Sequence, residues 1–191
     1  MTTDHMTGAE LQTLREACHI SRDELATLAG VQARTVKHWE GGRAGVPGDV
    51  VALVRKIDAQ VSHAARQALA HMAGAVPDGA AVVFTRYRSA DDLARYRPDM
   101  AGLPAGVQAA MVARVLAGCA LGLGGTGVPG DASAPGAVVL RVVWFEPAAF
   151  EAWRAQHQQP NTEAARAMWA GSVALASQAL PHRADQPPPG V

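Results

Sequence analysis

Apolar residues recur at steps of three and four between residues 50 and 72, which predicts one amphipathic helix of about six turns. The recurring positions are Val50, Leu53, Val54, Ile57, Val61, Ala64, Ala65, Ala68, Leu69 and Met72. The helix is longer than the short segments before it need for a shared core. We therefore expect its second half to pack on a partner chain or on the next domain.

Three shorter amphipathic segments precede this helix. Thr7 with Glu10 and Ser21 with Glu24 have the capping-box spacing that begins a helix. The first of these helices directs Leu11, Leu14 and Cys18 inward. These signals predict an all-α region at the start of the chain.

The segment from residue 21 to residue 47 has the layout of two short helices joined by a tight turn. Gly30 permits the turn, because glycine takes a positive φ at little cost. The second short helix is predicted over residues 32–40, with Val36 and Trp39 inward. Its outward residues are Gln32, Ala33, Arg34, Lys37 and His38. A helix with short polar and cationic side chains at its N-terminal end fits the DNA major groove.

These residues resemble the Cro/repressor-type (XRE) helix-turn-helix family over about residues 7–58. The matching features are Leu25-Ala26, Gly30, Trp39-Glu40-Gly41-Gly42 and Pro47. The resemblance implies double-stranded DNA as a partner. The glutamines usual in this family are replaced by Ala33 and Arg34, which leaves the operator sequence open. The alternative is a helical hairpin that binds no DNA.

Site residues follow from position and from the resemblance. The predicted base-reading residues are Gln32, Ala33, Arg34 and His38, and the predicted phosphate contacts are Arg22, Lys37 and Arg43. In the resembled family, the helix that Arg22 would begin crosses the DNA backbone. The same resemblance implies an ion pair between Arg15 and Glu40 that holds the reading helix.

The second half of the chain has a β-α-α-β-α-α pattern. Strands are predicted at residues 80–87 and 137–145, where β-branched and aromatic residues are concentrated. The predicted helices run from Ser89 to Pro98, over residues 105–121, from Pro147, and from Asn161-Thr162 to about residue 180.

The predicted fold class is α+β. A five-helix, all-α helix-turn-helix domain with its own complete core (residues 1–73) precedes a small mixed α/β dimerisation domain (residues 80–180). Residues 181–191 are expected to be disordered. Both strands are apolar on both faces, so a partner subunit is expected to cover them and the protein to be a homodimer.

The order of elements is also similar to that of anti-CRISPR-associated two-domain regulators. The features that carry this resemblance are Glu10-Leu11-Gln12, Ala33-Arg34, Trp39-Glu40 and Val46-Pro47. It implies a dimerisation role for the C-terminal domain. The Gly-rich loop at residues 122–136 and the last helix depart from that pattern.

Charge and composition narrow the picture. The formal net charge is +0, so the cations near residues 34–43 must supply any attraction to DNA locally. The first twelve residues have no apolar signal core, and no apolar run reaches membrane-spanning length. A cytoplasmic protein with no membrane partner is expected, with Cys18 and Cys119 as free, buried thiols.

No catalytic, metal or cofactor site is expected. Residues 122–127 fit the letters of a dinucleotide-binding fingerprint, but no strand precedes them and no helix follows. The seven histidines have no metal-ligand spacing, and no Ser-His-Asp or Cys-His set can be assembled. Four arginines (Arg86, Arg88, Arg95 and Arg97) flank Tyr87 and Tyr96. They are either an RNA or phosphate site or a solvated rim whose arginine stems pack on the tyrosines.

The leading hypothesis is a transcriptional regulator, a repressor that binds a palindromic operator as a homodimer. One alternative is a DNA-targeted sensor or enzyme with a small-molecule site in the C-terminal domain, although the sequence shows no obvious lining for such a site. Another is the antitoxin of a toxin-antitoxin pair, with a toxin as an additional partner.

Overall fold

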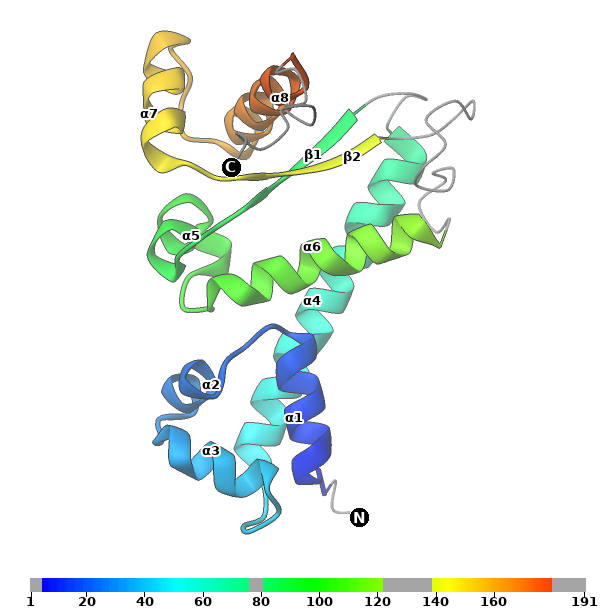
Figure 1. Cartoon of the computed structure of the whole chain (residues 1–191), viewed down its shortest axis with the longest axis vertical. Helices are drawn as coiled ribbons and strands as arrows, with labels where there is room; N and C mark the ends of the chain where they lie inside the picture. Colours follow the sequence, from blue (N-terminus) through cyan, green and yellow to red (C-terminus); the bar gives the residue numbers. More distant parts are fainter. Residues whose placement is uncertain (1–4, 76–80, 122–138, 180–191) are drawn as a thin grey trace, which may run out of the picture.

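The computed structural model describes residues 5–75, 81–121 and 139–179 (Figure 1). Its elements are α1 (Gly8–Ala17), α2 (Arg22–Ala29), α3 (Ala33–Glu40), α4 (Gly48–Ala75), β1 (Ala81–Arg86), α5 (Ala90–Tyr96), η1 (Pro98–Met100), α6 (Ala105–Ala120), β2 (Val139–Trp144), α7 (Pro147–Gln156) and α8 (Glu163–Ala179). The described chain before residue 81 holds four helices, so the expected five-helix count is not met there.

Local capping signals form as predicted. The Thr7 hydroxyl accepts from the Glu10 N–H while the Glu10 carboxylate accepts from the Thr7 N–H, and Ser21 and Glu24 repeat this arrangement at the start of α2. Gly30 ends α2 with a φ of 66°, in the left-handed region that glycine tolerates. These signals fix the turn between α2 and α3.

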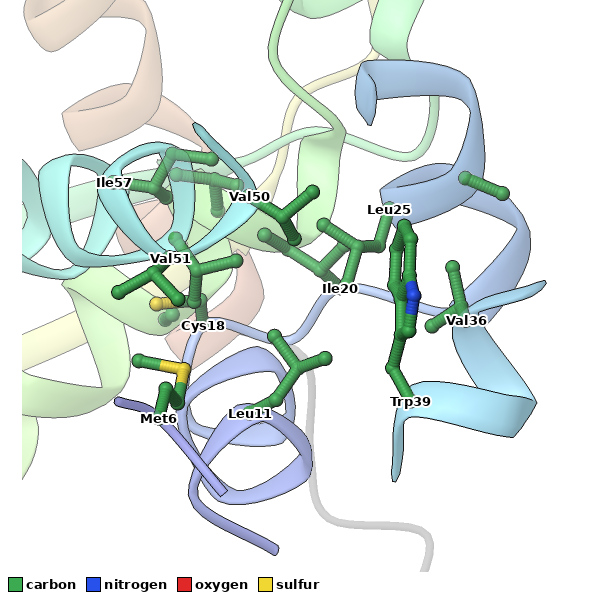
Figure 2. Packing of buried hydrophobic residues seen from close by; sticks show 14 of the residues in the cluster. Met6, Leu11, Cys18, Ile20, Leu25, Val36, Trp39, Val50, Val51 and Ile57 are labelled. Atoms are coloured by element: carbon green, nitrogen blue, oxygen red, sulfur yellow. The ribbon is translucent and has the colours of Figure 1, made fainter. Parts of the chain in front are cut away.

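The first core gathers side chains from α1 to α4, as Figure 2 shows for ten labelled residues including Leu11, Trp39 and Val51. Two residues of α6, Val107 and Ala110, are buried in the same cluster. The expectation that the N-terminal domain completes its core alone is therefore wrong. The missing contribution comes from a helix that lies more than thirty residues later in the chain.

Helix α4 joins the two halves of the molecule as one continuous rod (Figure 1). Its second half packs on α6, where both helices contribute to a cluster of Ala65, Leu69, Met72, Val115 and Cys119. Arg114 of α6 also pairs with Asp58 of α4 at 2.7 Å and donates to the Ser62 hydroxyl at 2.5 Å. The second half of α4 was expected to pack on a partner chain or on the next domain, and the structure shows it packed on the next domain.

The second half of the chain has the predicted β-α-α-β-α-α order, with η1 as a short addition. Strands β1 and β2 pair in parallel, in a register that runs from Ala81 opposite Val139 to Arg86 opposite Trp144. Parallel pairing requires a crossover connection, which α5, η1 and α6 supply.

Helices of the same chain pack on both faces of this sheet. Val82, Phe84 and Leu140 pack on α4 and α6. The opposite face carries an aromatic cluster with α5, α7 and α8, made of Tyr87, Tyr96, Phe145, Phe150 and Trp169. Coverage is incomplete along β2, because Val142 and Trp144 remain 38% and 42% exposed, so the expectation that a partner covers the strands stays a prediction.

Two of the segments discussed in the sequence analysis are not described by the structure. The Gly-rich loop at residues 122–136 and the tail at residues 181–191 lie outside the described residues. Within the described residues neither Cys18 nor Cys119 forms a disulfide, and both are buried, as predicted. Among the described helices, none combines the length and apolarity needed to cross a membrane.

Candidate nucleic-acid interface

Helix α3 presents the predicted reading face to solvent. Gln32 is the N-cap residue and makes no side-chain capping bond, so its amide remains exposed. Arg34 and His38 are exposed one turn apart, and Lys37 is exposed beside them. Ala33 differs, since it is half-buried against the first core and leaves little but its methyl group for a base contact.

The opposite face of α3 anchors the helix. Val36 is fully buried and Trp39 is 6% exposed, three residues apart on the inward face. The prediction that Trp39 is a core anchor and not a base-stacking residue agrees with this burial. The orientation of Arg34 and His38 is thus set by packing on the other side of the same helix.

Glu40 closes α3 in a three-residue ionic cluster. Arg15 Nε donates to Glu40 Oε1 at 2.6 Å, and Arg22 Nε donates to Glu40 Oε2 at 2.5 Å. Arg15 also donates through Nη1 to the Ile20 carbonyl at 2.6 Å. The Arg15–Glu40 pair that the family resemblance implied is confirmed, and it ties α1 and the start of α2 to the end of α3.

This cluster keeps Glu40 ionised. Burial raises the pKa of Glu40, but hydrogen bonds and charge from Arg15 and Arg22 outweigh burial and hold the pKa below its ordinary value. The Glu40 side chain is only 2% exposed, so its charge is compensated almost entirely by the two guanidinium groups.

Four of the predicted DNA contacts, Ala33 among them, line one shallow depression between α2 and α3. The depression measures about 440 Å³ and its cations include Arg22, Arg34 and Lys37, with Glu16 and Asp23 as the acidic residues. Arg43 lies apart from it, exposed beyond the end of α3. The structure therefore brings base-reading and phosphate candidates together at one surface, with Arg43 at its side.

Arg22 has a role that the sequence did not reveal. Its Nε is held by Glu40, while its side chain remains 45% exposed and its Nη groups make no hydrogen bond within the described chain. One side of the guanidinium positions α3 and the other faces solvent. The positioning role could not be predicted from the sequence, because it depends on the contact between the start of α2 and the end of α3 in the folded chain.

The arginines around Tyr87 and Tyr96 divide into different environments. Arg95 lies over the Tyr96 ring at 5.4 Å, as the solvated-rim reading predicts. Arg86 and Arg88 instead lie over Trp144, at 5.0 and 4.2 Å, and Arg97 pairs with Asp99 at 2.9 Å. These contacts do not form a single cationic patch.

Comparison with known proteins agrees with this geometry. Residues 7–69 match a family model described as a helix-turn-helix domain, which covers α1 to α3 and most of α4. No curated protein matches the chain. Residues 7–69 of this chain therefore form a helix-turn-helix domain of the DNA-binding kind.

Proposed function

We propose that this protein is a sequence-specific transcriptional repressor that binds a palindromic operator as a homodimer. Helix α3 enters the major groove, Arg34 and His38 contact base edges with Gln32 at the helix start, and the methyl group of Ala33 lies beside them. Arg22, Lys37 and Arg43 contact phosphates. The proposal assigns no catalysis, metal or cofactor to the chain.

The observation that carries this proposal is the exposed cationic face of α3 on a rigid support. Arg34 and Lys37 are free to reach a ligand, while Val36, Trp39 and the Arg15–Glu40–Arg22 cluster hold the helix from behind. A fixed helix that presents arginine to the groove suits bidentate contact with guanine O6 and N7. The same support fixes the register of the phosphate contacts.

Helix α8 supports the homodimer. Met168 and Leu175 are 56% and 67% exposed and lie seven residues apart on one face. Gly171 lies between them, and a Cβ atom there would meet nothing within 4 Å. A flat apolar helix face of this kind suits packing against the same helix of a second copy. A palindromic operator requires the two reading helices of such a dimer to lie ~34 Å apart.

The salt dependence of DNA binding tests the proposed contacts. Fluorescence anisotropy of a labelled mixed-sequence duplex should show binding that weakens steeply as salt rises. Lys37→Gln and Arg43→Gln should each lower the slope of log K against log salt by about one, because each removes one phosphate contact. Arg154→Gln in α7 is the matched control and should leave the slope unchanged. Absence of wild-type binding at low salt would overturn the proposal.

A further inference from the structure

A cavity of about 350 Å³ lies between α4, α6, β1 and α8. Ala68 of α4, Met111 of α6 and the strand residues Val82 and Phe84 give it apolar walls. Cavities of this size with apolar walls and a few polar groups are typical of small-molecule sites. This one lies away from the DNA-binding face of α3.

Two polar atoms of the cavity lining have no hydrogen-bond partner within the described residues: the Tyr87 hydroxyl and Gln108 Oε1. Both residues are almost fully buried, at 3% and 2% exposure. The Gln108 amide is fixed in orientation, because its Nε2 donates to the Thr85 carbonyl at 2.7 Å. Buried polar atoms without a partner are uncommon in folded proteins and carry a free-energy cost.

The lining also carries positive charge. Arg166 of α8 and Arg97 line the cavity together with one acid, Glu163. Arg97 is paired with Asp99, whereas within the described residues Arg166 donates only through Nη1, to the Asn161 side chain. Burial raises the pKa of Tyr87, and the positive charges of Arg166 and Arg97 offset part of that rise. Both guanidinium groups line the same cavity as Tyr87.

The edge of β1 that faces away from β2 adds main-chain N–H donors to the cavity lining. The Arg86 carbonyl accepts from the Phe145 N–H, so Arg86 and alternate residues of β1 bond to β2. Val83 and Thr85 lie between them in the register and direct their main-chain groups away from β2, toward the cavity that both residues line.

We propose that this cavity binds a small organic acid: an apolar body with a carboxylate at one end and an N–H or O–H donor at the other. The carboxylate accepts from the Tyr87 hydroxyl and Arg166, the donor bonds to Gln108 Oε1, and the apolar body contacts Val82, Phe84 and Met111.

Two of the helices that line the cavity, α4 and α6, also contribute to the core of the helix-turn-helix domain. Helix α6 contributes Gln108 and Met111 to the cavity and Val107 and Ala110 to the first core. Its Gly106 lies so close to the α1–α2 turn that a Cβ atom there would be 2.0 Å from the His19 carbonyl oxygen. A ligand that moves α6 therefore also moves the residues on which α2 and α3 pack, and should change the affinity for DNA. This predicted change in DNA affinity rests on the proposed function, whereas binding of the acid itself does not.

Three probe acids test the site on the full-length protein without DNA: indole-3-acetate, 4-hydroxyphenylacetate and 4-aminobenzoate. Ligand-observed NMR should show saturable binding in the millimolar range for at least one of them. Its methyl ester, which lacks the negative charge, should bind at least about tenfold more weakly. Failure of all three acids to bind would overturn the proposal.

A pair of tyrosine variants locates the binding. Tyr87→Phe should weaken the bound acid about tenfold and leave the melting temperature unchanged or higher, because the lost hydroxyl has no partner. Tyr96→Phe is the matched control, since the Tyr96 hydroxyl donates to Glu151 in the same aromatic cluster at 2.9 Å. It should lower the melting temperature and leave binding unchanged.

Arg166→Gln should weaken the acid and not its methyl ester. Equal binding of the acid to wild type, Tyr87→Phe and Arg166→Gln would overturn the site. A change of oligomeric state in these variants, with no acid bound, would instead identify the cavity as a contact with another protein segment. If the acid binds as predicted but DNA binding is absent, the site stands and the proposed DNA function fails.

Discussion

At the scale of single residues, Glu40 determines how the reading helix is held. Its carboxylate connects Arg15 of α1 with Arg22 at the start of α2, so three helices meet at one buried charge. Buried ion pairs often contribute little net stability, but a buried charge that loses its partner is strongly destabilising. Substitution of Glu40 should therefore lower the free energy of unfolding more than substitution of its exposed neighbour Glu16.

Replacing Glu40 with Gln should lower the free energy of unfolding by ~3 kcal/mol, because Arg15 then loses its buried counter-charge and keeps only the exposed Glu16. Urea unfolding monitored by tryptophan fluorescence measures this. Glu16→Gln is the control: Glu16 also contacts Arg15, at 3.2 Å, but its side chain is 55% exposed. That change should cost less than ~1 kcal/mol. Equal effects of the two substitutions would contradict the role given to Glu40.

The pH dependence has a definite sign. The pKa of Glu40 is lower in the folded protein than its ordinary value of 4.5, so its contribution is present above pH 4.5 and is lost as pH falls toward the folded pKa. Wild type should therefore lose stability below pH 4.5 more steeply than Glu40→Gln. Parallel curves for the two proteins in that range would show that Glu40 is not the group responsible.

Arg34 is the residue expected to carry base specificity. Arg34→Ala should weaken binding to the cognate site by ~1–3 kcal/mol and relax the preference at one base position, because a bidentate contact to guanine is lost. Competition between cognate and random duplexes separates this from a charge effect. An equal loss on random DNA would show that Arg34 contacts phosphate.

At the scale of elements, α6 is the connection between the two halves of the chain. It contributes to the first core through Val107 and Ala110 and to the α4 contact through Val115 and Cys119. Gly106 brings its first turn against the backbone of the α1–α2 turn. The helix-turn-helix domain therefore depends on a helix that lies outside the region matched by the family model.

Gly106→Ala tests this dependence. The new methyl group would meet the His19 carbonyl oxygen, a backbone atom, so α6 must move and the protein should lose ~1–3 kcal/mol of stability. Gly48→Ala, at the start of α4, is the control because a Cβ atom there meets nothing within 4 Å. Thermal unfolding compares the two. A stable Gly106→Ala protein would mean that α6 can separate from α1 without loss.

Local signals explain why much of the fold was predictable from the sequence. The capping boxes at Thr7 and Ser21 and the turn at Gly30 act over three or four residues, and they fix α1 to α3. The α6 contribution to the first core was missed because it joins residues far apart in the sequence, such as His19 and Gly106. The helices that pack on the two faces of β1 and β2 also come from distant segments. The proposed acid site was invisible because its lining comes from four separate segments.

At the scale of the whole molecule, α4 and α6 combine two functional regions into one unit (Figure 1). The proposed DNA-binding face lies on α3, and the proposed dimer contact lies on α8. Helices of one chain pack on both faces of its sheet, and the exposed apolar face of α8 is a separate surface for the proposed dimer.

A double substitution in α8 tests this surface. Met168→Glu with Leu175→Glu should convert the full-length dimer to a monomer, because charge replaces the apolar helix face while the buried side of α8 is unchanged. Leu121→Glu, which alters a leucine that is 75% exposed at the end of α6, is the control and should remain dimeric. Light scattering distinguishes the two, and a wild-type monomer would defeat the dimer model.

The most direct test of the central claim is selection of bound duplexes from a random pool by the full-length protein, followed by sequencing. The account predicts a palindromic consensus whose half-sites are centred about one helical turn apart. It also predicts that Arg34→Ala loses the preference at one position of each half-site. Enrichment of no sequence, or of a consensus that Arg34→Ala leaves unchanged, would contradict sequence reading by α3.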